Sequence, residues 1–274
     1  MVDTKLQDQM RRIVADFNAG RHDQARLLCE EGLRRTPDEP ALNHLLAAVL
    51  FAKGEVAEAR AHIRASLSIR ADNASAHVLA GRIARAAKDF EPALHHFARA
   101  AELAPGVAVL IERARTLDEA GDRSQAYQAW QAVARADPSS AEAAARLGRI
   151  LFEDGMPAEA APLLERAVKG DAPASAWFDL ALVRQDLHEH AAAAAAYRKA
   201  LEKRPDDAEA AVNLGVALQE TGDMDAAIQA YRTAYQQRPT TFGIIAMALT
   251  SAPHGRLWLD RDALKGLLGE PGKV

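Results

Sequence analysis

The composition describes a globular, helix-forming chain. It has 274 residues, with 34 Lys and Arg against 38 Asp and Glu, which gives a formal net charge of −4. Hydrophobic residues make up 49% and charged residues 26%, values that exclude a generally disordered chain. Only 5% is aromatic and much of the apolar content is alanine, so we expect close-packed helices rather than a β-sandwich or barrel.

The same numbers exclude several functional classes. The single cysteine, Cys29, rules out an intrachain disulfide framework and a cysteine zinc site. The slightly acidic balance argues against nucleic acid and anionic membranes as partners. No apolar run approaches the roughly 18 residues of a transmembrane helix, and residues 1–6 lack the apolar core of a signal peptide. We therefore expect a cytoplasmic protein.

Four series of residues recur along the chain every 33 or 34 positions. The first is mostly glycine, the second is always alanine, the third is mostly large and apolar, and the fourth is mostly proline. In chain order they are Gly20, Gly54, Lys88, Gly121, Gly155, His188, Gly222; Ala25, Ala59, Ala93, Ala126, Ala160, Ala193, Ala227; Cys29, Ile63, Phe97, Trp130, Leu164, Tyr197, Tyr231; and Pro37, Ala71, Pro105, Pro138, Ala172, Pro205, Pro239. Seven units in phase across four series indicate an internal repeat.

The seventh unit shows why such a sequence should fold as two helices. Leu214 and Leu218 recur at helical spacing and predict a first amphipathic helix. Gly222 can end that helix in a left-handed conformation, Asp223 can cap the second helix, and Pro239 prevents it from continuing. The alanine series predicts a close crossing of the two helices, and the large residue one turn later fills the gap beyond it.

These residues resemble the tetratricopeptide repeat (TPR), a helix–turn–helix unit of 34 residues. The family pattern places aromatic residues, Leu-Gly, Ala, Phe or Tyr, Ala and Pro at fixed offsets. The clearest matches are Trp177, Leu180, Ala193, Tyr197, Ala200 and Pro205 in the sixth unit and Leu214, Gly215, Ala227, Tyr231, Ala234 and Pro239 in the seventh. The first unit departs most, with Arg12, Ile13 and Asp16 at the Leu, Gly and aromatic positions, as a terminal cap can.

The resemblance implies an all-α, right-handed α-solenoid, or superhelix, of about seven TPR units over residues 1–241. The predicted units are 6–39, 40–73, 74–106, 107–140, 141–173, 174–207 and 208–241. Residues 242–274 break the period, with an apolar segment from Phe242, a turn at 251–255 and a short helix from Leu257 to Leu268. We expect this segment to cap the solenoid, and a docking or dimerisation element is the alternative.

The sequence carries no recognisable signature of catalysis. No phosphate-binding loop, nucleophile elbow, zincin motif or calcium-binding loop occurs. His95 and His96 are adjacent on a predicted helix, so they point to different faces and are poorly placed to share a metal. Cys29 stands in the large-residue series, which predicts a buried thiol. We expect no enzyme activity, cofactor or metal site.

Function is therefore expected on the face formed by the first helices, where the resemblance implies a concave groove that binds a peptide or a helix. The groove candidates stand mostly at the second, fifth, ninth and twelfth positions of the units, outside the core series. They are Phe17, His44, Phe51, Arg82, Arg85, Arg115, Arg149, Phe178 and Asn213. The arginine forks suit an acidic stretch or a chain-terminal carboxylate. The alternative is that local acids such as Glu112 or Asp118 already pair with them.

Three functions stay open. The leading one is a non-catalytic scaffold that binds a peptide or protein segment in the groove. The alternative is an accessory subunit or regulatory module of a separate protein-modifying enzyme, docked through residues 242–274. The third is a homo-oligomer formed by stacking of solenoid ends. The two-carboxylate clamp of chaperone-binding TPR proteins is disfavoured, because Asn213 is the only Asn at a clamp-like position.

Overall fold

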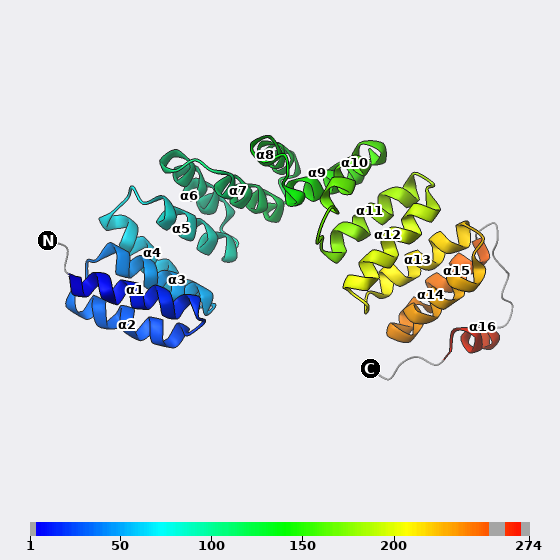
Figure 1. Ribbon diagram of the computed structural model, residues 1–274, viewed down its shortest axis with the longest axis horizontal. Coiled ribbons are helices and arrows are strands. Elements are labelled where there is room, and N and C mark those ends of the chain that lie inside the picture. The colour runs from blue at the N-terminus through cyan, green and yellow to red at the C-terminus, as the bar shows by residue number, and fades with distance from the viewer. Residues whose placement is uncertain (1–3, 252–260, 270–274) are drawn as a thin grey trace. The chain divides into compact units, whose positions relative to one another are not determined.

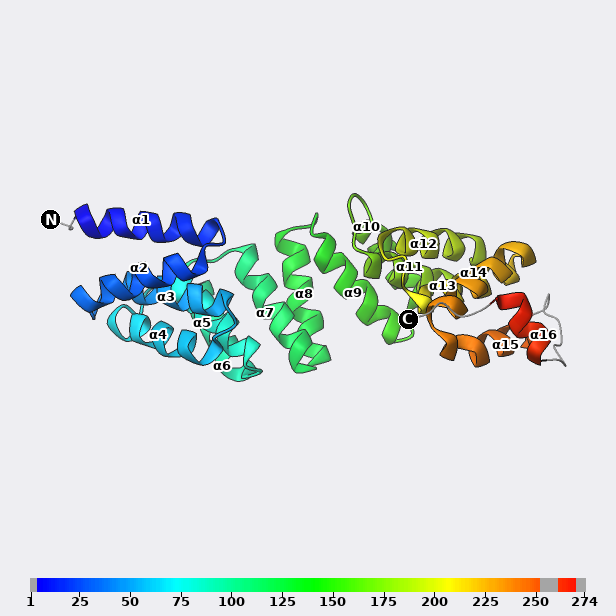
Figure 2. The ribbon, with the colours of Figure 1, turned by 90° about the horizontal axis from the view of Figure 1, so that it is seen from below.

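The computed structural model describes residues 4–251 and 261–269, and within these ranges it contains helices and no strand. The chain divides into two compact units, Met1–Pro138 (unit 1) and Ser139–Val274 (unit 2), which are described separately. Within each unit, successive helices pack against one another along the chain (Figures 1 and 2). The predicted all-α solenoid architecture is therefore confirmed.

Helices α1 to α14 follow one another as pairs joined by turns of two or three residues. Unit 1 contains α1 (Thr4–Asn18), α2 (His22–Arg35), α3 (Pro40–Ala52), α4 (Val56–Ile69), α5 (Ala74–Ala86), α6 (Phe90–Leu103), α7 (Val107–Ala120) and α8 (Arg123–Ala136). Unit 2 contains α9 (Ala141–Glu153), α10 (Pro157–Ala167), α11 (Ala174–Asp186), α12 (His190–Lys203), α13 (Ala208–Glu220), α14 (Met224–Gln237), the 3-10 turn η1 (Pro239–Thr241), α15 (Phe242–Ser251) and α16 (Arg261–Leu268). We call the odd-numbered helices α1 to α13 first helices and their partners second helices.

The C-terminal segment keeps the helical spacing of the preceding pairs although its residues do not match the four series. Helix α15 begins 34 residues after α13, and α16 packs against α14. Two hydrogen bonds from the Arg232 guanidinium to the Leu267 carbonyl, at 2.9 and 3.2 Å, hold the end of α16 on α14. The predicted turn spans 251–255, but Ser251 is the last residue of α15, and the other residues of that turn lie outside the described residues, as does the predicted helix start at Leu257. The boundary at residue 241 stays a prediction.

The first residue series makes the same left-handed turn after every first helix. Its five glycines have φ between 73° and 84°. Its two other members, Lys88 and His188, have φ of 61° and 59°, a region that glycine adopts without strain and other residues rarely enter. The second helix then begins with the predicted cap at Asp223, whose carboxylate accepts a hydrogen bond from the Ala226 N–H at 3.2 Å.

The alanine and large-residue series form the core of each helix pair. All seven alanines are at most 1% exposed, as a close crossing requires. The first helix carries a small residue where the large residue of the second helix packs against it. In the seventh pair, for example, a Cβ added to Gly215 would lie 2.4 Å from the Tyr231 ring. In the first pair the sizes are exchanged: Ile13 takes the glycine position, Cys29 takes the large position, and both are fully buried. The departure in the first unit thus exchanges volume between the helices.

Gly215→Ala is expected to lower the free energy of unfolding of unit 2 by about 1–3 kcal/mol, because the new methyl group would overlap the Tyr231 ring. Urea unfolding measures it, followed by Trp177 fluorescence in a background with the other two tryptophans changed to Phe. Gly243→Ala is the matched control, because an added Cβ on this α15 residue meets nothing within 4 Å. A comparable loss in both variants would show that the contact with Tyr231 is not the cause.

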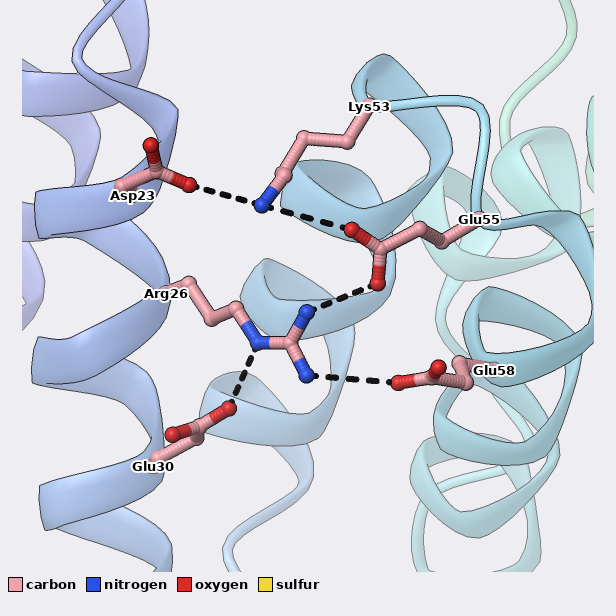
Figure 3. Close-up of polar contacts among 6 residues, drawn as sticks. All are labelled: Asp23, Arg26, Glu30, Lys53, Glu55 and Glu58. Atoms are coloured by element: carbon pink, nitrogen blue, oxygen red, sulfur yellow. Dashed lines mark hydrogen bonds and ion pairs between the residues drawn. The ribbon is translucent and has the colours of Figure 1, made fainter.

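A network of ion pairs joins the second helices of neighbouring pairs in unit 1 (Figure 3). Its members are Asp23, Arg26, Glu30, Lys53, Glu55 and Glu58. Arg26 of α2 contacts Glu55, which precedes α4, at 2.7 Å, and Lys53 contacts Glu55 at 3.3 Å. Arg60 and Asp89 pair in the same way 34 residues later. These charges connect one helix pair to the next.

Candidate functional site

Three of the predicted groove arginines converge on one buried carboxylate in unit 1. Arg82 and Arg85 lie on α5, and Arg115 lies on α7 with Glu112, which is 4% exposed. Arg82 contacts Oε1 of Glu112 through Nε at 2.8 Å and Nη2 at 2.6 Å. Nη1 of Arg85 lies 3.0 Å from Oε2, and Nη1 of Arg115 lies 3.9 Å from Oε1. The pairing with Glu112 that the sequence left open is therefore present.

The cluster keeps positive charge at the surface. Arg85 is largely enclosed, with 17% of its side chain exposed, and its Nε also lies 3.4 Å from Glu119. The side chains of Arg82 and Arg115, by contrast, are 46% and 41% exposed. Because a guanidinium carries five N–H donors, the exposed parts of Arg82 and Arg115 can also contact a partner while Glu112 holds them.

Unit 2 contains the same arrangement between α9 and α11. Nη2 of Arg149 donates to Oδ1 of Asp179 at 2.8 Å, and Asp179 is 7% exposed. Burial raises the pKa of the Asp179 carboxyl, and the nearby Arg149 opposes that rise. Arg149 itself is 45% exposed. The pairs Arg82–Glu112 and Arg149–Asp179 both span 30 residues, so each unit has a half-exposed arginine held by a buried acid on the next first helix.

The aromatic groove candidates are half-buried within their own helix pairs. Phe17 and Phe51 pack against the core of unit 1. The ring of Phe178 meets that of Tyr197 edge to face, with 5.7 Å between centroids. Asn213 hydrogen-bonds to the Tyr197 hydroxyl, and burial raises the pKa of that hydroxyl. These side chains border the first-helix face rather than project from it.

The twelfth position of each unit matches the chemistry of the large residue on the second helix. Where that residue has a polar tip, the twelfth residue accepts its hydrogen bond. The pairs are Trp130–Asp118 at 2.7 Å, Tyr197–Gln185 at 3.1 Å and Tyr231–Gln219 at 3.0 Å. Where the large residue has no polar tip the twelfth residue is Phe, except opposite Phe97. These pairs are Phe17 with Cys29, Phe51 with Ile63 and Phe152 with Leu164. This position therefore serves the packing of the pair.

Two histidines of unit 1, buried His77 and half-buried His96, form a pair. Nδ1 of His77 lies 3.0 Å from Nδ1 of His96, and Nε2 of His77 lies 2.9 Å from the Ala71 carbonyl oxygen. Because a carbonyl only accepts, Nε2 of His77 carries a hydrogen, and in the neutral pair Nδ1 of His96 donates to His77. Burial, with the neighbouring His77 and His95, lowers the pKa of His96 to about 4.

The remaining chemically distinctive residues are enclosed. His44 on α3 is half-buried, and burial lowers the pKa of its ring. Cys29 is fully buried as predicted, and burial raises the pKa of its thiol to about 12, which makes it a poor nucleophile. Among the described residues no three His, Cys, Asp or Glu side chains gather as metal ligands. None of the described helices combines the length and apolar character needed to span a bilayer.

A cavity of about 450 Å³ lies beside Arg149 in unit 2. It is bordered by α9 as far as Arg149, the end of α10, the connection 168–173 and the start of α11. Its charged lining residues are Glu142, Arg146, Arg149, Lys169, Asp171 and Asp179. The cavity therefore adjoins the Arg149–Asp179 pair on the first-helix face.

The tetratricopeptide repeat family matches residues 16–83, 111–176 and 178–240 of this sequence. The chain belongs to the tetratricopeptide repeat family. Structures of TPR-like chains align with it over most of their length. PilF of Pseudomonas aeruginosa is 16% identical, with a TM-score of 0.65 over 73% of this chain and 91% of that one. A MamA protein is 25% identical, with a TM-score of 0.54 over 61% and 93%. No curated protein matches the sequence.

Membership of the TPR family indicates the general function of the chain. TPR arrays are protein-interaction modules and typically non-catalytic, so this TPR chain is a protein-interaction scaffold. The likeness to Cut9 in the APC/C hetero-tetramer Cut9–Hcn1, at 15% identity and a TM-score of 0.64 over 86% of this chain and 48% of that one, shows the shared fold alone.

The sequence places the arginines of this TPR chain on first helices, but it does not predict the cavity beside Arg149. The missed residues are Lys169 and the alanines around it. One signal was readable in the sequence, since Ala172 stands where five other units have proline. A second signal, the early end of α10 at Ala167, is visible only in the structure.

Proposed function

We propose that the first-helix face of this TPR chain binds an acid-containing segment of another protein. The observation that carries the proposal is the pair of arginine sites, Arg82, Arg85 and Arg115 around Glu112 and Arg149 on Asp179. Three of these side chains are between 41% and 46% exposed. A carboxylate of a partner can therefore reach guanidinium groups that the protein has already oriented.

The buried acids favour such binding by ordering the arginines in advance. A free arginine side chain loses considerable rotamer freedom when it binds, and an ordered one loses less. Glu112 and Asp179 restrict Arg82 and Arg149 before any partner arrives. The partner's carboxylates then add to a preformed array of donors.

The other groove candidates extend the proposed face. In unit 1, Phe17, His44 and Phe51 offer half-buried, largely apolar edges for hydrophobic side chains of the segment. In unit 2, Phe178 and Asn213 border the face beyond Arg149. We place this binding in the cytoplasm, in line with the single buried thiol.

The test is retention of synthetic acidic peptides on the immobilised protein, compared with versions in which every Asp and Glu is Asn or Gln. We expect preferential retention of the acidic set and its loss at high salt. Charge reversal of the arginines would strand buried acids, so the variant is Arg149→Gln with Asp179→Asn, which removes the pair as a unit. It should weaken binding of acidic peptides about tenfold. Equal retention of acidic and amide peptides by the native chain would overturn the proposal.

A second candidate is docking of a separate protein-modifying enzyme through residues 242–274. Ile244 and Met247, three residues apart on α15, are 60% and 69% exposed. Ala210 and Ala176, at the positions that correspond to Ile244 in earlier units, are buried. If Ile244→Ser with Met247→Ser abolishes co-purification of one enzyme while acidic peptides still bind, docking through α15 is favoured.

A further inference from the structure

The cavity beside Arg149 arises where unit 2 departs from its own regularity. Helix α10 has 11 residues, whereas every other second helix has 14. The chain leaves the helix after Ala167 and passes through Gly170, with φ of 91°, before α11 begins. The missing helical turn leaves space between α9 and α11.

The apolar part of the cavity lining consists largely of alanine methyl groups. The alanines that line it come from three helices and the connection, and they are Ala141, Ala145, Ala167, Ala172 and Ala176. The volume of about 450 Å³ falls within the roughly 300–1,000 Å³ typical of ligand pockets. Such a lining can take a bulky apolar side chain, because alanine side chains are too short to fill the space.

The rim of the cavity offers positive charge to an incoming acid. Of the three acids that line it, Asp179 is paired with Arg149, Asp171 is paired with Lys203, and Glu142 also interacts within the chain. Lys169 is exposed, and among the described residues its ammonium group has no ion pair. A carboxylate at the rim would therefore gain a cation that the protein does not already neutralise.

We infer that this cavity is an anchor subsite for a bulky apolar side chain of the bound segment, flanked by a carboxylate that contacts Lys169. The inference rests on the proposed function and names the sequence feature that the first-helix face selects. A buried apolar anchor beside a charge pair is the arrangement by which a few residues dominate an interface. The partner is therefore a segment in which an aromatic or large aliphatic residue neighbours Asp or Glu.

The experiment uses the full chain and synthetic peptides of equal length that differ only in a central pair: Phe-Glu, Ala-Glu, Phe-Lys or Phe-Gln. The native chain should bind Phe-Glu about tenfold more tightly than Ala-Glu and than Phe-Lys. Ala145→Phe fills the cavity and should remove the preference for Phe over Ala. Lys169→Glu should reverse the preference for Glu over Lys, and as a change at an exposed residue it should leave the fold intact.

Matched substitutions on α12 separate local from general effects. Ala195→Phe and Arg198→Glu change exposed residues of that helix and should leave both preferences unchanged. Persistence of the Phe preference in Ala145→Phe, with native helicity, would overturn the cavity assignment. Binding of acidic over amide peptides without any Phe preference would reject this inference alone. No preference for acidic peptides in the native chain would reject the proposed function.

Discussion

Replacing Arg82 and Arg85 together with alanine is expected to lower the free energy of unfolding of unit 1 by about 3–5 kcal/mol. Glu112 is 4% exposed and would keep only Arg115, at 3.9 Å, among its three arginines. A buried carboxylate without close partners is costly, whether it stays charged or takes up a proton. Urea unfolding followed by Trp130 fluorescence, with the other two tryptophans changed to Phe, reports on unit 1.

Adding Glu112→Leu to that double variant gives the decisive comparison. It removes the stranded charge and fills a similar volume with an apolar side chain, so stability should recover by about 2 kcal/mol or more. The triple variant would then be more stable than the double variant despite one more substitution. If the triple variant is no more stable, Glu112 is not the group whose charge the arginines compensate.

Unit 1 is expected to lose stability as the pH falls from about 6.5 toward 4, by up to about 3 kcal/mol from His96. Its folded pKa of about 4 lies below the ordinary value of 6.5, so protons bind more readily to the unfolded chain. The stabilising contribution is complete above pH 6.5 and declines below it. Burial lowers the pKa of His62 and His44 as well, which adds to the loss. Urea unfolding of unit 1 at pH 7 and pH 5 measures the effect.

The control for the pH effect is a pair of single variants. His96→Leu should flatten the dependence between pH 7 and pH 5, because the titrating ring is gone. His95→Gln changes an exposed neighbour and should leave most of the dependence in place. An unchanged slope in His96→Leu would exclude the His77–His96 pair as its source.

The fold could be predicted because its determinants are local and repeat. Each alanine at a crossing, each left-handed turn residue and each proline stands at a fixed offset, so the pattern is readable along the chain. Even the turns at Lys88 and His188 follow, since the surrounding pair imposes the same φ. The division at Pro138 was not predictable, because no residue series changes there.

The candidate site was predictable only in part. Their positions within the 34-residue unit identified Arg82 and Arg149 as first-helix residues. Their orientations, however, depend on Glu112 and Asp179 respectively, each of which lies 30 residues further along the chain on the next first helix. Such contacts depend on how neighbouring pairs stack. The cavity depends on where α10 ends, and helix ends are poorly determined by sequence.

The most direct test of the first-helix face is site-specific photo-crosslinking in cell extract. A benzophenone side chain is placed at Ser175, an exposed residue at the cavity on α11, and separately at Ala195 on α12. We predict a defined partner adduct from Ser175 that excess Phe-Glu peptide suppresses, and no such adduct from Ala195. An adduct from Ala195 with none from Ser175 would contradict binding on the first-helix face.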